Sequence, residues 1–193
     1  MSEIPIFPLR TVLFPGGQLP LRIFEQRYLD MVKKCSRTDT GFGVCFLVEA
    51  DEDQSRFQSA RVGTLARIVD WYTMEDGLLG LTTEGTSRFI LQKDRHDENG
   101  LMVGEVSWLP EPPTTTMPVA FDVLSQVLAR FMEKASDHYS DYTPEMLQDA
   151  SWVGYRLSEL LPLGGVEKQH LLELDDPIDR LQKLLDLLPR FQA

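Results

Sequence analysis

Residues 4–28 read IPIFPLRTVLFPGGQLPLRIFEQRY, and this stretch carries the strongest local signals in the chain. Proline fixes its own φ and disfavours helix at the residue before it, so Pro8, Pro15 and Pro20 predict extended segments and turns. The Gly16-Gly17 pair permits a tight turn, because glycine adopts positive φ at no steric cost. The stretch therefore predicts two short extended segments with a tight turn between them.

The second of these segments and the residues after it can be assigned further. Residues 19–23 alternate apolar and other side chains, as a half-buried strand does. Pro20 cannot donate a ladder hydrogen bond, so this strand is expected at a sheet edge or at a strand start. Residues 24–35 place apolar side chains at helical spacing, which predicts one helix inserted among the strands. The expected apolar face is Phe24, Tyr28, Met31 or Val32, and Cys35.

Further strand signals follow this helix. Residues 42–48 form an apolar run too short for a buried helix, and residues 62–74 and 78–91 are rich in β-branched and aromatic residues. Asp76-Gly77 between the two long runs is a hairpin signal, and a last run covers residues 101–109. Strands joined by hairpins predict an antiparallel barrel or sandwich.

The pattern changes at residues 110–118, which contain four prolines in nine residues and cannot form a regular ladder or helix. Beyond them the hydrophobic period changes from 2 to 3.6. We therefore expect a β-rich subdomain over residues 1–109, a proline-rich linker over residues 110–117 and a helical subdomain over residues 118–193.

Helix signals divide the last part of the chain. Residues 119–134 and 166–174 have helical patterns, and Thr143-Pro144 and Asp176-Pro177 each place a cap residue before a proline at the first helical position. Each helix has one apolar stripe, and together the stripes predict a small bundle around a shared core. For residues 119–134 the expected core stripe is Ala120, Val123, Leu124, Val127, Leu128 and Phe131. A peptide groove between the two subdomains is the alternative use of such stripes.

Composition and charge restrict the class of protein. The chain has 193 residues, 42% of them hydrophobic and 25% charged, which excludes general disorder. With 19 Lys+Arg against 30 Asp+Glu the net charge is -11, so nucleic acid and anionic membranes are not expected partners. The longest apolar run, residues 44–48, is far shorter than a membrane helix requires.

The cellular compartment is expected to be the cytoplasm, because the N-terminal residues lack a basic region followed by an apolar stretch. Cys35 and Cys45 are not a Cys-x-x-Cys pair, and a cytoplasmic chain of this size needs no cross-link. We therefore expect both cysteines to be free thiols.

Catalytic motifs are absent from the sequence. It contains neither a phosphate-binding Gly-x-x-x-x-Gly-Lys loop nor a Gly-x-Ser-x-Gly nucleophile elbow. Of three histidines, His96 lies in a polar turn and His138 in a loop between helices. We therefore expect no enzyme activity, no cofactor and no metal.

One alternative stays open on the helix that carries His170. Glu167 and Glu173 lie three residues before and after it, so all three side chains can share one face. A carboxylate–histidine site there would make the protein a small enzyme, with or without a metal. The competing interpretation is a solvated face, because a di-iron bundle site needs a second Glu-x-x-His pair and the sequence has none.

Several segments together resemble one known family, the substrate-binding N-terminal domain of ATP-dependent Lon proteases. These segments are IPIFPL (4–9), LFPG (13–16), LPLRIFEQRY (19–28), VGTLARI (62–68), EGTSRF (84–89) and EKQHLLE (167–173). Gln26 departs from the family, which commonly has proline at this position. The resemblance covers nearly the whole chain.

The resemblance implies an α+β fold: a PUA-like antiparallel β pseudo-barrel with an inserted helix, followed by a small α-helical bundle. It implies recognition of unfolded or tagged polypeptide without cleavage, because no ATPase or protease module is present, and the chain is expected to be a stand-alone domain. Self-association is a further possibility, and the oligomeric state is left open.

A candidate peptide-binding surface combines the edge strand, the helix start and a long strand. Its residues are Arg22, Glu25, Arg27, Tyr28, Trp71 and Tyr72. Aromatic side chains with a few charges are typical of interfaces, and an extended peptide can pair with a sheet edge. The charged residues have a structural interpretation as well, as an ion-pair cluster where the strand meets the helix.

Overall fold

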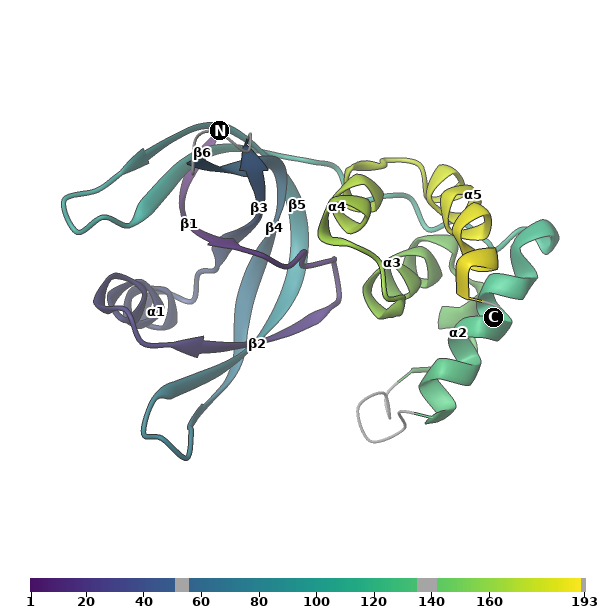
Figure 1. Ribbon diagram of the computed structural model, residues 1–193, viewed down its shortest axis with the longest axis horizontal. Coiled ribbons are helices and arrows are strands. Elements are labelled where there is room, and N and C mark those ends of the chain that lie inside the picture. The colour runs from purple at the N-terminus through teal and green to yellow at the C-terminus, as the bar shows by residue number, and fades with distance from the viewer. Residues whose placement is uncertain (51–55, 135–141, 192–193) are drawn as a thin grey trace. The chain divides into compact units, whose positions relative to one another are not determined.

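The computed structural model describes residues 1–50, 56–134 and 142–191, and the chain divides into two compact units (Figure 1). We call Met1–Glu111 the barrel unit and Pro112–Ala193 the helical unit. All described strands and one α-helix belong to the barrel unit. Every helix in the described ranges is too short or too polar to cross a lipid bilayer.

The barrel unit is built from one sheet that closes on itself. The strands are β1 (Ser2–Leu9), β2 (Gln18–Ile23), β3 (Phe42–Ala50), β4 (Arg56–Thr73), β5 (Leu79–His96) and β6 (Met102–Trp108), with α1 (Gln26–Thr38) following β2 in the chain. Among the described residues the six strands have the order β2-β5-β4-β3-β1-β6, and β6 also pairs with β5. Within that same part of the chain β2 pairs with β5 alone, so it is an edge strand, one of the two positions that Pro20 predicted.

The predicted α+β class with a PUA-like pseudo-barrel is confirmed, with one difference in strand direction. β1 and β3 pair in parallel, whereas the other pairings are antiparallel. A parallel pair requires a crossover of a dozen or more residues, and the segment with β2 and α1 supplies it. The alternation of side chains does not specify strand direction, so the sequence pattern could not show this pair.

The β4–β5 hairpin forms most of the wall of the barrel. Each strand has 18 residues, and Gly77 in the predicted turn has a φ of 82° that only glycine adopts freely. The strands extend to Arg56 and His96, beyond the ranges that the sequence pattern indicated. Register shifts interrupt the β4–β5 ladder, and such bulges let long strands bend around a ring.

Helix α1 packs its predicted face on the barrel. Its buried side chains are Tyr28, Met31, Val32 and Cys35. The Tyr28 ring stacks on Phe7 with 4.0 Å between ring centroids. The helix begins at Gln26 and not at residue 24, because Glu25 has an extended ψ of 135°. Phe24 therefore lies outside the helix and is 65% exposed.

A second group of buried side chains surrounds Phe89. A Cβ atom at Gly43 or at Gly63 would lie 2.6 Å from Cζ of Phe89, so a side chain at either position would collide with the ring. Cys45 packs in the same group. Both cysteines are buried free thiols, as predicted, and burial raises the pKa of Cys45 to about 12.

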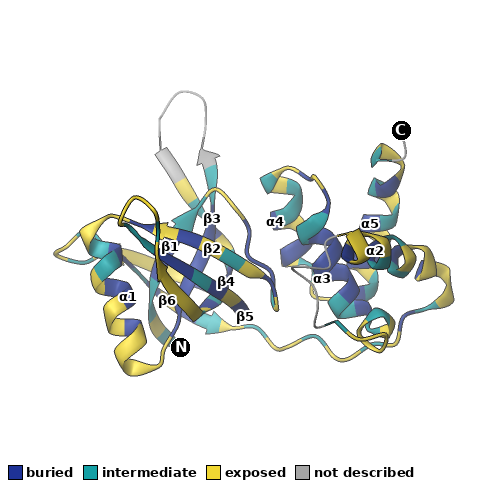
Figure 2. Cartoon of the chain, turned by 90° about the horizontal axis from the view of Figure 1, so that it is seen from below, coloured by how far each residue is buried: buried dark blue, intermediate teal, exposed yellow. Residues whose placement is uncertain are grey.

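The helical unit consists of short helices around an apolar centre (Figure 2). The α-helices are α2 (Asp122–Lys134), α3 (Ala150–Leu160), α4 (Gly165–Glu173) and α5 (Pro177–Leu187). The 3-10 helices are η1 (Val119–Phe121), η2 (Met146–Gln148) and η3 (Leu188–Phe191). Helix α3 contacts α2, α4 and α5, so it is the centre of the bundle.

Two predictions for this unit were wrong in detail. Thr143-Pro144 does not begin the long helix; α3 begins at Ala150, where the Asp149 carboxylate accepts from the Ser151 N–H at 2.9 Å. The apolar face of α2 is also rotated from the predicted stripe. Its buried residues are Leu124, Leu128 and Met132.

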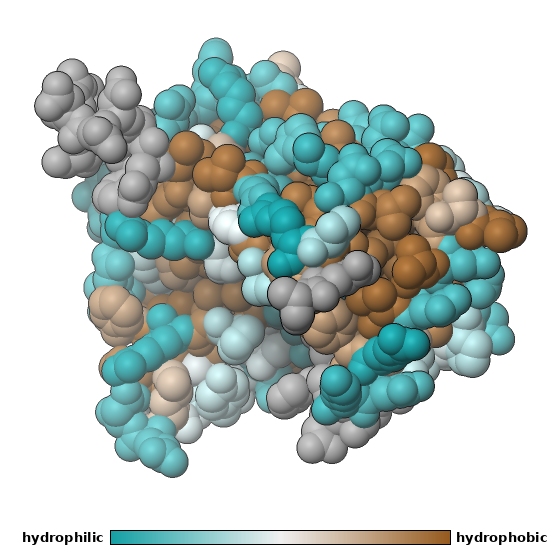
Figure 3. Space-filling view, turned by 45° about the vertical axis from the view of Figure 1, so that its right-hand side comes forward, coloured by the Kyte–Doolittle hydropathy of each residue, from teal (hydrophilic) through white to brown (hydrophobic). Residues whose placement is uncertain are grey.

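Helix α2 exposes part of the stripe that was expected to be core. Val123 is 40% exposed and Phe131 is 39% exposed, while Val119 just before the helix is 84% exposed. Patches of hydrophobic residues among hydrophilic ones are visible on the face shown in Figure 3. The apolar residues of α2 form two adjacent rows, so spacing alone did not decide which row packs inward.

Candidate functional site

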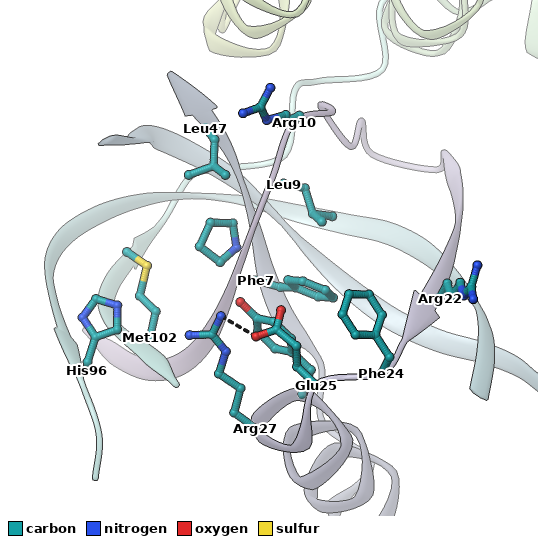
Figure 4. A pocket seen from close by; sticks show the side chains of 12 residues that line it. Phe7, Leu9, Arg10, Arg22, Phe24, Glu25, Arg27, Leu47, His96 and Met102 are labelled. Carbon is teal, nitrogen blue, oxygen red and sulfur yellow. Dashed lines mark ion pairs between the residues drawn. The ribbon is translucent and has the colours of Figure 1, made fainter. Parts of the chain in front are cut away.

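A cavity of about 510 Å³ opens in the barrel unit beside the start of α1; we call it the α1 cavity (Figure 4). Its lining residues are Phe7, Pro8, Leu9, Arg10, Arg22, Phe24, Glu25, Arg27, Tyr28, Leu47, His96 and Met102. They come from β1, from the end of β2, from the first turn of α1 and from strands β3, β5 and β6. Segments far apart in the sequence thus converge on one hollow.

The sheet topology explains why a hollow lies here. β1 pairs with β3 and β6, whereas the edge strand β2 pairs with β5, so the two N-terminal strands do not hydrogen-bond to each other. The stacked rings of Phe7 and Tyr28 form part of the cavity wall. Phe24 stands at its side with 65% of its surface exposed. An exposed phenylalanine beside an apolar hollow is available for contact with a ligand.

Arg27 is held in place inside the cavity by three contacts. Its Nη2 lies 2.7 Å from the Glu25 carboxylate, and its Nη1 donates to the Gly100 carbonyl at 2.9 Å. Its guanidinium also lies over the Tyr28 ring, 4.7 Å from the centroid. Figure 4 shows Arg27 and Glu25 pointing toward each other. The predicted ion-pair cluster at the strand–helix junction is therefore present for this pair.

The ionisation of Tyr28 is suppressed in this setting. Burial raises the pKa of its hydroxyl, the Arg27 cation opposes that change, and the Glu25 carboxylate adds to it. Tyr28 thus stays neutral and acts as an aromatic surface. Arg22, at the rim, pairs with Asp76 from the β4–β5 hairpin.

A second cavity of about 300 Å³ continues the first; we call it the adjoining cavity. Pro8, Leu47, His96 and Met102 line both cavities, so the two meet along β1. The lining of the adjoining cavity is more polar. Its other residues are Gln58, Ser59, Arg61, Leu91, Gln92 and Asp94. The hollow therefore continues from the α1 cavity into the adjoining cavity.

Four of the six predicted site residues line the α1 cavity: Arg22, Glu25, Arg27 and Tyr28. Trp71 and Tyr72 are exposed on β4, at 58% and 43%, and do not belong to this lining. β5 separates β2 from β4, and Tyr72 covers Gly80, where a Cβ would lie 2.4 Å from the ring. The sequence did not reveal that one strand intervenes.

Other lining residues were missed by sequence reasoning. Phe24 was assigned to a helical stripe, and Leu47, His96 and Met102 to ordinary strands and turns. Phe24 was missed by two positions, because the apolar spacing begins at residue 24 whereas the helix begins at Gln26. The others join the site only through the ring closure of the sheet, which local patterns do not encode.

The histidine–carboxylate alternative on α4 is not assembled into a cluster. Glu167 accepts from the Gly164 N–H at 3.0 Å and pairs with Arg190, while Glu173 accepts from Gln169 at 2.8 Å. His170 is exposed, and within the described ranges no group of three or more His, Cys, Asp or Glu side chains could hold a metal ion. His138 lies outside the described residues.

Comparison with solved structures supports this fold. A crystal structure of a Lon N-terminal domain protein from Xanthomonas campestris is 40% identical, with a TM-score of 0.81 over 96% of this chain and 98% of that one. The N-terminal domain of the Mycobacterium avium complex Lon protease is 18% identical with a TM-score of 0.69, and covers 96% of this chain and 97% of that one, a likeness of fold alone.

Comparison with curated proteins identifies longer relatives. The Lon protease of Cytophaga hutchinsonii is 29% identical over 98% of this chain and 24% of its own length. Lon protease 2 of Myxococcus xanthus is 29% identical over 97% of this chain and 23% of its own length. The chain thus spans about a quarter of the relatives that it matches.

A family model decides the classification. The model of the ATP-dependent protease La (LON) substrate-binding domain matches residues 3–190, which span both units and include every residue of the α1 cavity. This match agrees with the segment resemblance in residues 4–28 and with the closed sheet that those residues begin. The chain therefore belongs to the family of Lon substrate-binding domains.

Proposed function

We propose that this protein is a non-catalytic polypeptide-recognition module that binds a short extended segment of an unfolded or tagged polypeptide in the α1 cavity. The observation that carries the proposal is an open cavity with an exposed phenylalanine, next to the edge of β2 with which no other described strand pairs. The family match supports it, because the matched domain is the one described as substrate-binding. The proposal requires no cofactor.

The cavity has the composition that peptide recognition needs. Phe7, Leu9, Phe24 and Met102 supply apolar surface, which favours aliphatic and aromatic side chains through burial. The outer edge of β2, which is unpaired among the described strands, can pair with an extended backbone, and such pairing gives affinity independent of sequence. Pro20 lacks an N–H, so pairing is expected mainly toward the Arg22 end of the strand.

The test is a titration with an unfolded polypeptide. A reduced, carboxamidomethylated model protein carrying one dye is titrated with wild-type protein, and binding is followed by fluorescence anisotropy. Phe24→Ala is expected to weaken binding by about 1–2 kcal/mol, the usual loss when an interface anchor is truncated. Trp71→Ala is the matched aromatic control on β4, and its affinity is expected to equal that of the wild type.

The outcomes separate the possible sites. Circular dichroism first establishes that each variant is folded. A loss of affinity in Trp71→Ala, with none in Phe24→Ala, would place the binding surface on β4 and contradict the α1 cavity as the site. Absence of binding by the wild type to a panel of such unfolded polypeptides would overturn polypeptide recognition itself.

A further inference from the structure

We infer that the polypeptide segment bound in the α1 cavity carries an acidic side chain next to an apolar one, and that Arg27 receives its carboxylate. This inference rests on the proposed function and specifies the class of segment. The cavity lining contains three arginines, Arg10, Arg22 and Arg27, and one carboxylate, Glu25, whereas the whole chain has a net charge of -11. Arg22 is paired with Asp76, which does not belong to the lining.

The cavity lining is more positive than the chain as a whole, so the cavity is electrostatically complementary to an acidic group of a ligand. An acidic surface repels acidic ligands at long range, so a locally positive hollow selects where an acidic side chain can dock. A nucleic-acid strand carries many phosphates and meets the net repulsion along its whole length. A single carboxylate on an otherwise apolar segment avoids most of that repulsion, which favours a polypeptide over RNA or DNA.

Arg27 is the cation best placed to receive the carboxylate. Its side chain is 34% exposed, so a ligand can reach it, and the Tyr28 ring and the Gly100 carbonyl hold it in the cavity. Its Nε is buried and has no hydrogen-bond partner among the described residues. Arg22 is engaged by Asp76 at the rim, and Figure 4 shows it at one side of the cavity.

Glu25 already contacts the guanidinium of Arg27, to which the ligand carboxylate would also bind. Its side chain makes no capping bond to the backbone of α1 and instead contacts Nη2 of Arg27 at 2.7 Å. With 43% of the side chain exposed, water and incoming groups can compete for this contact. Glu25 thus weakens the attraction of Arg27 for a second carboxylate, and its removal is expected to strengthen binding of an acidic segment.

The source of the carboxylate follows from the shape of the surface. The adjoining cavity continues past Pro8, so a segment lying across Arg27 has space to continue on that side. A chain end is therefore not required, and the carboxylate is assigned to an internal Asp or Glu side chain. Phe24 and Leu9 line the same cavity as Arg27, with Glu25 between Arg27 and Phe24 in Figure 4, and supply apolar surface for the neighbouring side chain.

The experiment uses three dye-labelled peptides that are acetylated and amidated and differ at one position. Each is an extended segment with phenylalanine and leucine, and the variable residue is Glu, Gln or Lys. In low salt the Glu peptide is expected to bind wild-type protein about fivefold more tightly than the Gln peptide, the scale of a partly exposed ion pair. The Lys peptide is expected to bind most weakly, and added salt reduces these differences.

Two substitutions are expected to act in opposite directions. Arg27→Gln removes the preference for Glu over Gln, while Glu25→Gln increases the affinity for the Glu peptide. Arg67→Gln is the matched control, because Arg67 is an exposed arginine that pairs with Asp39 and does not line the cavity. Phe24→Ala weakens all three peptides alike, because it removes apolar contact only.

The results test the acidic-segment inference and the proposed polypeptide recognition separately. If all three peptides bind with equal affinity, or if Arg27→Gln keeps the preference for Glu, the acidic-segment inference is overturned and polypeptide recognition stands. If none binds, while the unfolded model protein also fails to bind, the proposed function is overturned. Displacement of the Glu peptide by an RNA 12-mer would assign the charged cavity to nucleic acid and contradict the inference.

Discussion

At the scale of single residues, Arg180 shows how the helical unit tolerates a buried charge. Its side chain is fully buried, its Nε donates to the Leu171 carbonyl at 3.0 Å, and Nη2 donates to the Leu174 carbonyl. Its guanidinium also lies 4.1 Å from the Tyr155 ring centroid. These are the carbonyls at the end of α4, which the helix itself cannot satisfy. Arg180 thus caps one helix from another.

Arg180→Met is expected to lower the free energy of unfolding by about 2–4 kcal/mol, because it leaves these buried carbonyls unpaired. Urea unfolding followed by circular dichroism measures the loss. Lys183→Met on the exposed side of α5 is the control and is expected to change stability little. A loss in Arg180→Met as small as that of the control would contradict the capping role.

Glu167 gives a prediction of pH dependence. A hydrogen bond from Arg190 and another from the Gly164 N–H lower the pKa of its carboxyl. A carboxyl whose pKa is lower in the folded state adds stability above its unfolded pKa, and this stability is lost as the pH falls through the folded pKa. Wild type is therefore expected to exceed Glu167→Gln in unfolding free energy at pH 7, with the difference vanishing in acid.

Denaturant titrations of both proteins between pH 7 and pH 3 measure this difference. Glutamine can still accept from the Gly164 N–H, so the comparison isolates the charge. A difference between the two proteins that stays constant over the whole pH range would show that the carboxylate charge contributes nothing to folding stability.

At the scale of elements, the closed sheet depends on close approach of neighbouring strands. In the ladder Gly63 pairs with Cys45 on one side and with Phe89 on the other. A Cβ at Gly63 would lie 2.6 Å from the Phe89 ring and 2.6 Å from the Val44 carbonyl oxygen. Gly63→Ala is therefore expected to destabilise the barrel unit by about 1–3 kcal/mol through overpacking.

A double-mutant cycle with Phe89→Leu measures this collision directly. The smaller side chain makes room for the methyl group, so the two substitutions together are expected to cost less than the sum of the single losses. Strict additivity in urea unfolding would show that the Phe89 ring does not limit the space at Gly63.

Two helix-start signals of the same kind had different outcomes, and the difference is physical. At Asp176-Pro177 the carboxylate accepts from the Ile178 N–H at 2.8 Å, and α5 begins as predicted. At Thr143-Pro144 the chain forms a turn and the 3-10 helix η2 before Asp149 caps α3. The helix therefore begins after the later capping carboxylate, that of Asp149, and not after Thr143. The spacing of residues in the sequence does not predict which of two possible caps a helix uses.

At the scale of the whole molecule, hydrophobic period and turn residues agree over long segments and predicted a β-rich part followed by helices. The resemblance of segments such as residues 4–28 to a known family added the PUA-like pseudo-barrel. The sequence also placed Arg22, Glu25, Arg27 and Tyr28 together, because all four lie within seven residues. It could not place His96 and Met102 beside them, since their approach follows from β6 pairing with both β1 and β5. Ring closure is a long-range property that strand alternation does not contain.

We propose that the barrel unit and the helical unit unfold independently, as the change of hydrophobic period across the proline-rich segment suggests. Calorimetry of the full chain is then expected to show that Arg180→Met and Gly63→Ala each lower a different transition. For units of this size, a loss of 2 kcal/mol corresponds to a shift of about 10 °C. A single transition lowered equally by both substitutions would show one cooperative unit.

The central claim is that the α1 cavity is where this protein binds an unfolded polypeptide, and amide NMR tests it most directly. The isotope-labelled full chain is titrated with an unlabelled, permanently unfolded polypeptide, and chemical-shift changes are mapped along the sequence. We predict the largest changes in residues 7–10 and 22–28 and at Met102, with smaller changes on the far side of the barrel unit. Changes confined to the helical unit, at saturating polypeptide, would contradict the claim.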